Sequence, residues 1–171
     1  MMAPILRVML VVLLLTGQSG AAETETKTPL ARLTGVQVTA ITDADSLRAG
    51  PLRLRLFGVD APEMRQSCAD KAGHPYACGK AARNWLASFL PKGAELSCDL
   101  LDQDRYGRLI TRCFYQGSDI AAQLVAAGWA LAWQRYSEDY LPLQTRARNR
   151  KAGLWAGQFD RPWDWRRKQP K

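Results

Sequence analysis

Three short segments place acidic and basic side chains together at points where a pattern of alternating apolar residues breaks. They are residues 43–46 (DADS), 55–63 (RLFGVDAPE) and 104–108 (DRYGR). Each segment alone is ordinary turn material, because Asp and Gly favour turns. Together they supply carboxylates and guanidinium groups, the side chains that hydrolysis of a phosphodiester bond requires.

That chemistry needs a deprotonated water and donors that balance negative charge on the phosphoryl oxygens. Carboxylate oxygens suit Ca²⁺ or Mg²⁺, and arginines offer phosphate a forked donor that stays charged. The single histidine, His74, lies between Gly73 and Pro75, and we do not expect it to act as the base. A carboxylate is then the expected base. Glu63 follows Pro62, which stiffens its loop, and nearby cations would keep it ionised.

Together, these motifs resemble the thermonuclease, or staphylococcal nuclease-like, family. The resemblance covers about residues 33–165 and includes VDAPE at 59–63, DRYGR at 104–108, LVAAG at 124–128, AR at 147–148 and GLW at 153–155. It implies an α+β fold that is mainly a five-stranded OB-fold barrel with three helices. It also implies calcium-dependent hydrolysis of DNA and RNA to products with a 3′-phosphate and a 5′-hydroxyl.

The resemblance assigns roles to two groups of residues. The metal ligands would be Asp45, Asp60 and the backbone carbonyl of Ala61. The catalytic residues would be Glu63, as general base, with Arg55 and Arg108 on the scissile phosphate.

The main departure from the family pattern is Ala44. The family has Asp-Gly-Asp-Thr, whereas this chain has alanine at the glycine position and Ser46, which keeps a hydroxyl, at the last one. If the glycine is needed for a positive φ, Ala44 imposes strain of about 1 to 2 kcal/mol and displaces Asp45. Restoring glycine would then leave the fold intact and tighten calcium binding.

Apolar patterning predicts the elements that position these motifs. The predicted strands include residues 33–41, 51–59, 94–101 and 109–115. The predicted helices lie at about 81–90, 118–128 and 141–151. Ser118 is the expected cap of the second helix, and the turn at 104–107 predicts a hairpin. Three strands, a helix, two strands and two helices predict a small closed barrel with helices.

The N-terminal residues 1–22 have the pattern of a signal peptide. A short N-terminal region ends at the basic residue Arg7, residues 8–15 are apolar, and small residues follow. The apolar run is shorter than the roughly 20 residues of a membrane-spanning helix. We therefore expect export, to the periplasm or the medium, without stable membrane insertion; an uncleaved signal anchor is the alternative.

The remaining chain divides by composition. Residues 23–32 have little to bury and predict a flexible linker, followed by a nuclease domain at 33–166 and a basic tail at 167–171. The basic and aromatic end of the chain, from residue 161, could dock on the barrel, contact nucleic acid, or do both. We interpret Trp133 and Tyr136 as core residues in preference to a stacking platform for a nucleotide.

The four cysteines are Cys68, Cys78, Cys98 and Cys113. An even number in an exported chain favours disulfides, and the absence of a C-x-x-C pair or a companion histidine argues against a zinc site. Three pairings are open from the sequence. We predict Cys68–Cys78 and Cys98–Cys113, because the second pair lies symmetrically about the turn at 105–106 and could face across the hairpin.

The chain carries 24 Lys and Arg against 16 Asp and Glu, a net charge of +8. Cationic surfaces recruit phosphates, so the expected partners are DNA and RNA, bound by a monomer. One alternative is a catalytically silent OB-fold module that only binds nucleic acid. Another is a basic protein that adheres to an anionic envelope surface. The first would be expected to lose site residues, and the second leaves the carboxylates unexplained.

Overall fold

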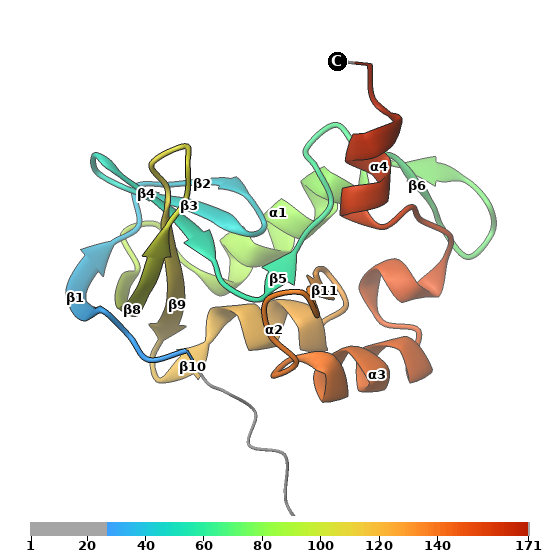
Figure 1. Cartoon of the computed structure of the whole chain (residues 1–171). Helices are drawn as coiled ribbons and strands as arrows, with labels where there is room; N and C mark the ends of the chain where they lie inside the picture. The colour runs from blue at the N-terminus through green and yellow to red at the C-terminus, as the bar shows by residue number, and fades with distance from the viewer. Residues whose placement is uncertain (1–26, 171) are drawn as a thin grey trace, which may run out of the picture.

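A single mixed sheet dominates the computed structural model, which describes residues 27–170 (Figure 1). The predicted signal peptide and residues 23–26 of the predicted linker lie outside the described residues. The sheet runs in the order β1-β8-β9-β4-β3-β2, and β10 (Ser118–Asp119) also pairs with β9. Its strands are β1 (Ala31–Gln37), β2 (Ala40–Asp43), β3 (Ser46–Ala49), β4 (Leu52–Leu56), β8 (Glu95–Gln103) and β9 (Leu109–Tyr115).

The segment from β1 to β2 closes this sheet into a barrel. β1 pairs with β8, and β2, which follows after two residues, pairs with β3 at the opposite end of the strand order. At the change of partner, the Val38 amide donates to the Ala94 carbonyl at 2.9 Å and the Thr39 amide donates to the Arg48 carbonyl at 2.8 Å. Counting β1 and β2 as one bent strand, five strands surround the core. The predicted five-stranded OB-fold barrel is therefore confirmed.

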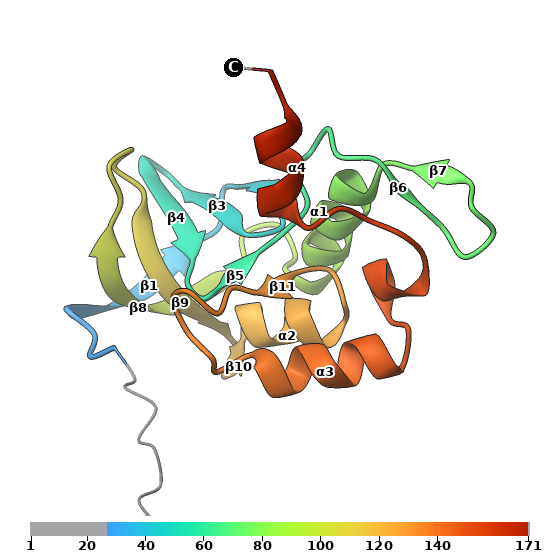
Figure 2. The same cartoon turned by 45° about the vertical axis from the view of Figure 1, so that its right-hand side comes forward.

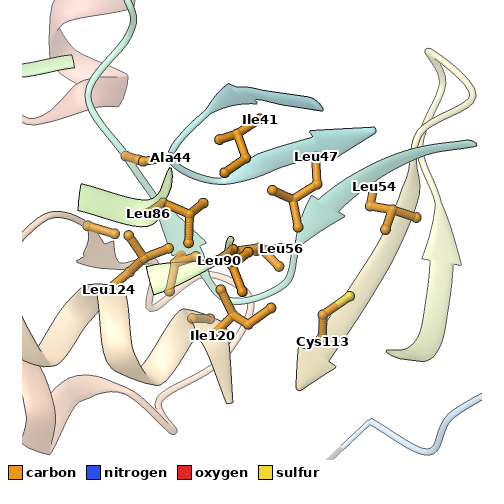
Figure 3. Packing of buried hydrophobic residues seen from close by; sticks show 14 of the residues in the cluster. Ile41, Ala44, Leu47, Leu54, Leu56, Leu86, Leu90, Cys113, Ile120 and Leu124 are labelled. Atoms are coloured by element: carbon orange, nitrogen blue, oxygen red, sulfur yellow. The ribbon is translucent and has the colours of Figure 1, made fainter. Parts of the chain in front are cut away.

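The alternation predicted for residues 51–59 separates the core from the site. Leu54 and Leu56 on β4 are each 1% exposed and pack in the barrel, whereas Arg55 between them points away from it. Figure 3 shows Leu56 beside Leu86 of α1 and Ile120 at the start of α2, with Leu54 further along the same cluster. One apolar cluster thus fixes the strand that carries Arg55.

Ala44 belongs to the same cluster and is fully buried (Figure 3). Its φ is not positive: among the described non-glycine residues, only Gln116 and Lys151 have positive φ. The expected strain at Ala44 is therefore wrong. The turn between β2 and β3 accepts a side chain at this position, and the methyl group fills space in the core.

Within residues 27–170, the three expected helices are present, and one further α-helix and one 3₁₀ helix accompany them. They are α1 (Cys78–Phe89), α2 (Ile120–Ala126), α3 (Leu141–Asn149), η1 (Gly153–Ala156) and α4 (Pro162–Lys168). The cap of α2 is Asp119, which accepts from the Ala122 amide at 3.1 Å, so the expected cap at Ser118 is one residue early. Among the described helices, none is long and apolar enough to cross a membrane.

Both ends of the domain extend further than composition indicated. The Leu30 amide donates to the Leu100 carbonyl at 2.7 Å, and β1 begins at Ala31, inside the predicted linker. At the other end, α4 continues to Lys168, so the expected boundary between domain and tail falls within a helix. Backbone pairing orders the first segment although most of its side chains are exposed, and composition does not reveal backbone pairing.

Two short strand pairs and one disulfide hold the outer loops, and a second disulfide lies within the barrel. β5 (Val59–Asp60) pairs with β11 (Leu131–Ala132), and β6 (Cys68–Ala69) pairs with β7 (Pro75–Tyr76). Both predicted disulfides, Cys68–Cys78 and Cys98–Cys113, are present. The second joins directly opposed residues of β8 and β9, which confirms that these cysteines face each other across the hairpin.

We predict that Ala44→Gly lowers the free energy of unfolding by about 1 kcal/mol. The change removes a buried methyl group, and glycine increases the conformational entropy of the unfolded chain. Urea denaturation of the calcium-free protein measures this change. Ala72→Gly, in the exposed loop between β6 and β7, is the matched control and should change stability less. A gain in stability for Ala44→Gly would show that the turn is strained after all.

Candidate active site

A pocket of about 730 Å³ opens beside β4, the hairpin between β8 and β9, and α4. Three of the predicted site residues line it, namely Arg55, Glu63 and Arg108. Asp45 and Asp60 are almost completely buried and connect to this pocket through arginine side chains. The fold therefore gathers all three sequence segments at one place.

Arg55 joins the two buried carboxylates. Asp45 lies in the turn after β2 and is 2% exposed, while Asp60 on β5 is fully buried. Arg55 donates through Nη1 to Asp45 Oδ1 and through Nη2 to Asp60 Oδ1, the latter at 2.7 Å. Because Arg55 points out of the core on β4, its guanidinium lies between the segments of Asp45 and Asp60 and donates to both.

The peptide after Asp60 is held against Asp45. The Ala61 amide donates to Asp45 Oδ2 at 2.7 Å, and the Ser46 hydroxyl donates to Oδ1 at 3.1 Å. Asp45, Asp60 and Ala61, the predicted metal ligands, therefore form one connected group. Ser46 uses its hydroxyl to hold the Asp45 carboxylate.

The buried side chain of Gln66 fixes the loop that carries Glu63. Gln66 is fully buried; its Oε1 accepts from the Glu63 amide at 3.2 Å, and its Nε2 donates to the Asp160 carbonyl at 2.8 Å. The N-terminus of α1 also meets this loop closely. A Cβ added at Gly79 would lie 1.8 Å from the Glu63 carbonyl oxygen, so only glycine fits there.

A third arginine, Arg166 of α4, contacts the same carboxylates. Its Nη2 donates to Asp60 Oδ2 at 2.7 Å, and its Nη1 donates to Asp60 Oδ1 at 3.1 Å and to Glu63 Oε1 at 2.6 Å. Figure 2 shows α4, in red, above the β5–β11 pair that carries Asp60. Sequence reasoning placed Arg166 at the boundary with a basic tail and missed this role.

Arg108 comes to the pocket from the hairpin. Asp104 accepts from the Arg108 amide at 2.9 Å through Oδ1 and from its Nε at 2.7 Å through Oδ2, which fixes the turn between β8 and β9. Nη1 and Nη2 are not engaged by Asp104, so this end of the guanidinium remains for an anion. The Asp-Arg-Tyr-Gly-Arg motif thus forms the turn and also positions the Arg108 side chain at the pocket.

Trp133 and Tyr136 line the pocket, so the interpretation of these residues as core is wrong. Tyr136 is 56% exposed, and its ring meets Trp133 edge to face with centroids 4.9 Å apart. The other side of Trp133 stacks on Trp163, at the start of α4, with centroids 6.1 Å apart. The loop after β11 thus places both rings at the pocket.

Burial and neighbouring charges shift the pKa values of two acidic side chains at the site. Burial, followed by the charges of Asp45 and Glu63, raises the pKa of Asp43 to about 6. Burial also raises the pKa of Asp60, while hydrogen bonds from Arg166 and the charge of Arg55 oppose that change. A concentration of negative charge in a buried place requires cations, and the arginines provide them.

The donor set suits a divalent cation, although within residues 27–170 no three His, Cys, Asp or Glu side chains gather into a metal-binding cluster. Asp45 and Asp60 supply hard carboxylate oxygens, which Ca²⁺ prefers. The Ala61 peptide lies against Asp45. The oxygens of both carboxylates accept hydrogen bonds from Arg55, Arg166 and neighbouring donors.

Local signals for α4 are present in the sequence. Pro162 stands in its first turn, Asp164 follows, and the basic residues Arg166, Arg167 and Lys168 end it. These are ordinary start and stop signals of a helix. They predict a short helix, but no local signal indicates that Arg166 reaches Asp60, which is 106 positions away.

A closed barrel whose pocket presents arginines, a carboxylate and aromatic rings defines an OB-type domain with a site for an anionic ligand. The chain matches the family described as Staphylococcal nuclease homologue over residues 53–157. This protein therefore belongs to the family of staphylococcal nuclease homologues.

Similar proteins come from bacteria and plants. The chain is 32% identical to the succinoglycan biosynthesis protein ExoI of Rhizobium meliloti (strain 1021), over 87% of this chain and 74% of that protein. It is 32% identical to an uncharacterized endonuclease of Escherichia coli O157:H7, over 73% and 76%. It is 30% identical to the probable staphylococcal-like nuclease CAN2 of Oryza sativa subsp. japonica, over 79% of this chain but 34% of the rice protein.

We predict that Gln66→Leu lowers the free energy of unfolding by about 2 to 3 kcal/mol, because the Glu63 amide and the Asp160 carbonyl lose their partner. Chemical denaturation measures the loss. Gln37→Leu, on the exposed side of β1, is the control and should have little effect. Equal stability of the two variants would show that Gln66 does not tie the Glu63 loop to the C-terminal segment.

Proposed function

We propose that this protein is a calcium-dependent phosphodiesterase that hydrolyses DNA and RNA to products with a 3′-phosphate and a 5′-hydroxyl. One observation carries the proposal: Glu63, Arg55 and Arg108, from three separate chain segments, line one pocket. Membership of the nuclease family and relatives named as nucleases support a nuclease acting on nucleic acids.

In this proposal, Glu63 takes a proton from a water molecule that attacks the phosphorus atom. Arg55 and Arg108 donate to the phosphoryl oxygens as negative charge develops on them. The P–O5′ bond breaks, and the 5′ oxygen leaves as a hydroxyl with a proton from solvent water. Glu63 returns its proton to the solvent, and the phosphate stays on the 3′ oxygen. The exposed face of Tyr136 and the ring of Trp133 offer stacking surfaces for a base beside the phosphate.

Asp45, Asp60 and the Ala61 carbonyl would hold the calcium ion. When bound, calcium neutralises charge on a phosphate oxygen next to the attacked phosphorus. Arg55 already bridges the two carboxylates and keeps them at the spacing that the fold dictates. Once calcium neutralised part of the charge on these carboxylates, Arg55 would direct an N–H donor to the phosphate.

The competing functions explain less of the site. A silent nucleic-acid-binding module would not need Glu63, Arg55 and Arg108 to meet in one pocket. A protein that adheres to an anionic envelope surface would not need Asp45 and Asp60 buried behind those arginines. The name of the Rhizobium relative refers to polysaccharide synthesis, and nothing in the described pocket favours that role here over hydrolysis of a phosphodiester.

We further propose that the protein is exported and acts as a monomer. Two disulfides among the described residues support an oxidising compartment, either the periplasm or the medium. Fractionation of cells that express the full chain, with sizing of the recovered protein, tests both statements.

Digestion of plasmid DNA and of RNA by the purified protein, with calcium and with excess chelator, tests the proposed activity. We expect cutting of both substrates with calcium and almost none with chelator. End-labelling of the products should find 3′-phosphates. Binding without cutting would instead support the silent module, and equal cutting in chelator would remove calcium from the proposal.

We predict that Glu63→Gln lowers kcat by about 10² to 10⁴-fold with little change in substrate affinity, because the amide keeps the shape but not the basicity. Arg55→Lys and Arg108→Lys should also slow cutting, since lysine lacks the forked donor. Combined changes should be far from additive, because all act on one step. Single-turnover digestion in saturating calcium measures these effects.

Arg48→Lys, on the exposed side of β3, is the matched control and should cut at the wild-type rate. Wild-type cutting by Glu63→Gln would refute the site assignment even with the fold intact.

A further inference from the structure

Arg166 holds the two acidic groups that the proposed function uses most. Its guanidinium donates twice to Asp60, the fully buried metal ligand, and once to Glu63, the general base. A carboxylate has about four acceptor positions. Asp60 uses three of them, two for Arg166 and one for Arg55.

A calcium ion on Asp60 would need oxygen lone pairs that these guanidinium groups now occupy. It would also stand beside the positive charge of Arg166, which repels it. Arg55 bridges Asp45 and Asp60 from within the barrel wall and is 13% exposed, so it cannot move far. Arg166 is 36% exposed and lies on the pocket side, so it is the cation that can leave.

The attachment of α4 is consistent with such a departure. Two of its ion pairs stay within the C-terminal segment, Arg167 with Asp164 and Lys168 with Asp160. Apart from Arg166, the helix is anchored at its start, where Trp163 stacks on Trp133 and Pro162 is buried. In its last turn, Arg166 bonds to Asp60 and Glu63, and its guanidinium also lies over the Trp133 ring, 6.0 Å from the centroid.

We propose that Arg166 is an internal cation that competes with calcium for Asp60 and Glu63, so that α4 closes the site when calcium is absent. In the closed state Arg166 stabilises the buried carboxylate and occupies Glu63 Oε1, the atom that would accept a proton from water. Calcium binding displaces the guanidinium and frees Glu63. This inference rests on the calcium site of the proposed function.

Calorimetric titration of the full mature protein with calcium, without nucleic acid, tests the competition. Arg166→Gln removes the competing charge, and Arg167→Gln removes the same charge from the neighbouring position of the same helix, where the side chain is 77% exposed. We expect Arg166→Gln to bind calcium about tenfold or more tightly than wild type, since a charge-assisted pair no longer has to break. Arg167→Gln should stay within about twofold, because an exposed charge is screened by salt.

Thermal melting in chelator and in saturating calcium supplies a second readout. Arg166→Gln should melt below wild type in chelator, because Asp60 loses a partner, and calcium should narrow or close that gap. If Arg166 only supported the fold, the gap would be the same in both conditions. Should Arg166→Gln fail to fold, Arg166→Lys keeps the charge but loses the fork, and should show a smaller shift in the same direction.

Equal calcium affinity of wild type and Arg166→Gln would overturn the competition and leave the calcium-dependent nuclease standing. An equal gain in both glutamine variants would also overturn it, because net charge alone would then explain the effect. Absence of calcium binding in every variant would remove the metal from the proposed function and the competition with it. Weaker binding by Arg166→Gln would assign Arg166 to support of the metal site.

Discussion

Two adjacent carboxylates buried in a small barrel are the constraint on which the site depends. Asp45 and Asp60 are 2% and 0% exposed, and burial of an unpaired charge is far more costly than the total stability of such a domain allows. Arg55 meets both from β4, and Arg166 meets Asp60 from α4. Removal of Arg55 leaves Asp45 without a guanidinium partner, whereas removal of Arg166 leaves Asp60 paired with Arg55 alone. A buried carboxylate that loses a partner costs stability, because its charge is then less well compensated.

The loop between β5 and α1 fixes the position of Glu63, the proposed base, relative to the buried Asp60. Glu63 follows Asp60 by three positions, and Gln66 fastens its backbone to the segment that precedes α4. The Cys68–Cys78 disulfide closes the rest of the loop, and the Gly79 position lets α1 pack directly against it. The base is thus carried on a loop whose buried polar groups are satisfied, which keeps its position defined without regular secondary structure.

The pocket is electrostatically balanced, although the chain as a whole has a net charge of +8. Arg55, Arg108 and Arg166 each bond to a carboxylate of the protein itself. An anionic ligand can therefore bind Nη1 and Nη2 of Arg108 directly, whereas at Arg55 and Arg166 it must compete with carboxylates that are already bonded. Exposed aromatic rings beside these pairs add contact area that does not depend on charge.

From the sequence by itself we predicted the barrel and the segments of the site, and the symmetry of Cys98 and Cys113 about their turn favoured the disulfide pairing that the structure has. Alternation on β4 separated Leu54 and Leu56 from Arg55, and turn residues marked the hairpin that carries Arg108. The sequence did not determine that Trp133 and Tyr136 line the pocket, that Ala44 fits its turn, or that Arg166 reaches Asp60. Periodicity and turn preference act over a few residues, so they report local structure. Tertiary structure decides which distant arginine pairs with a buried carboxylate. The pairing forms only when the folded chain brings a cation close to the carboxylate, because an unpaired buried charge is unstable.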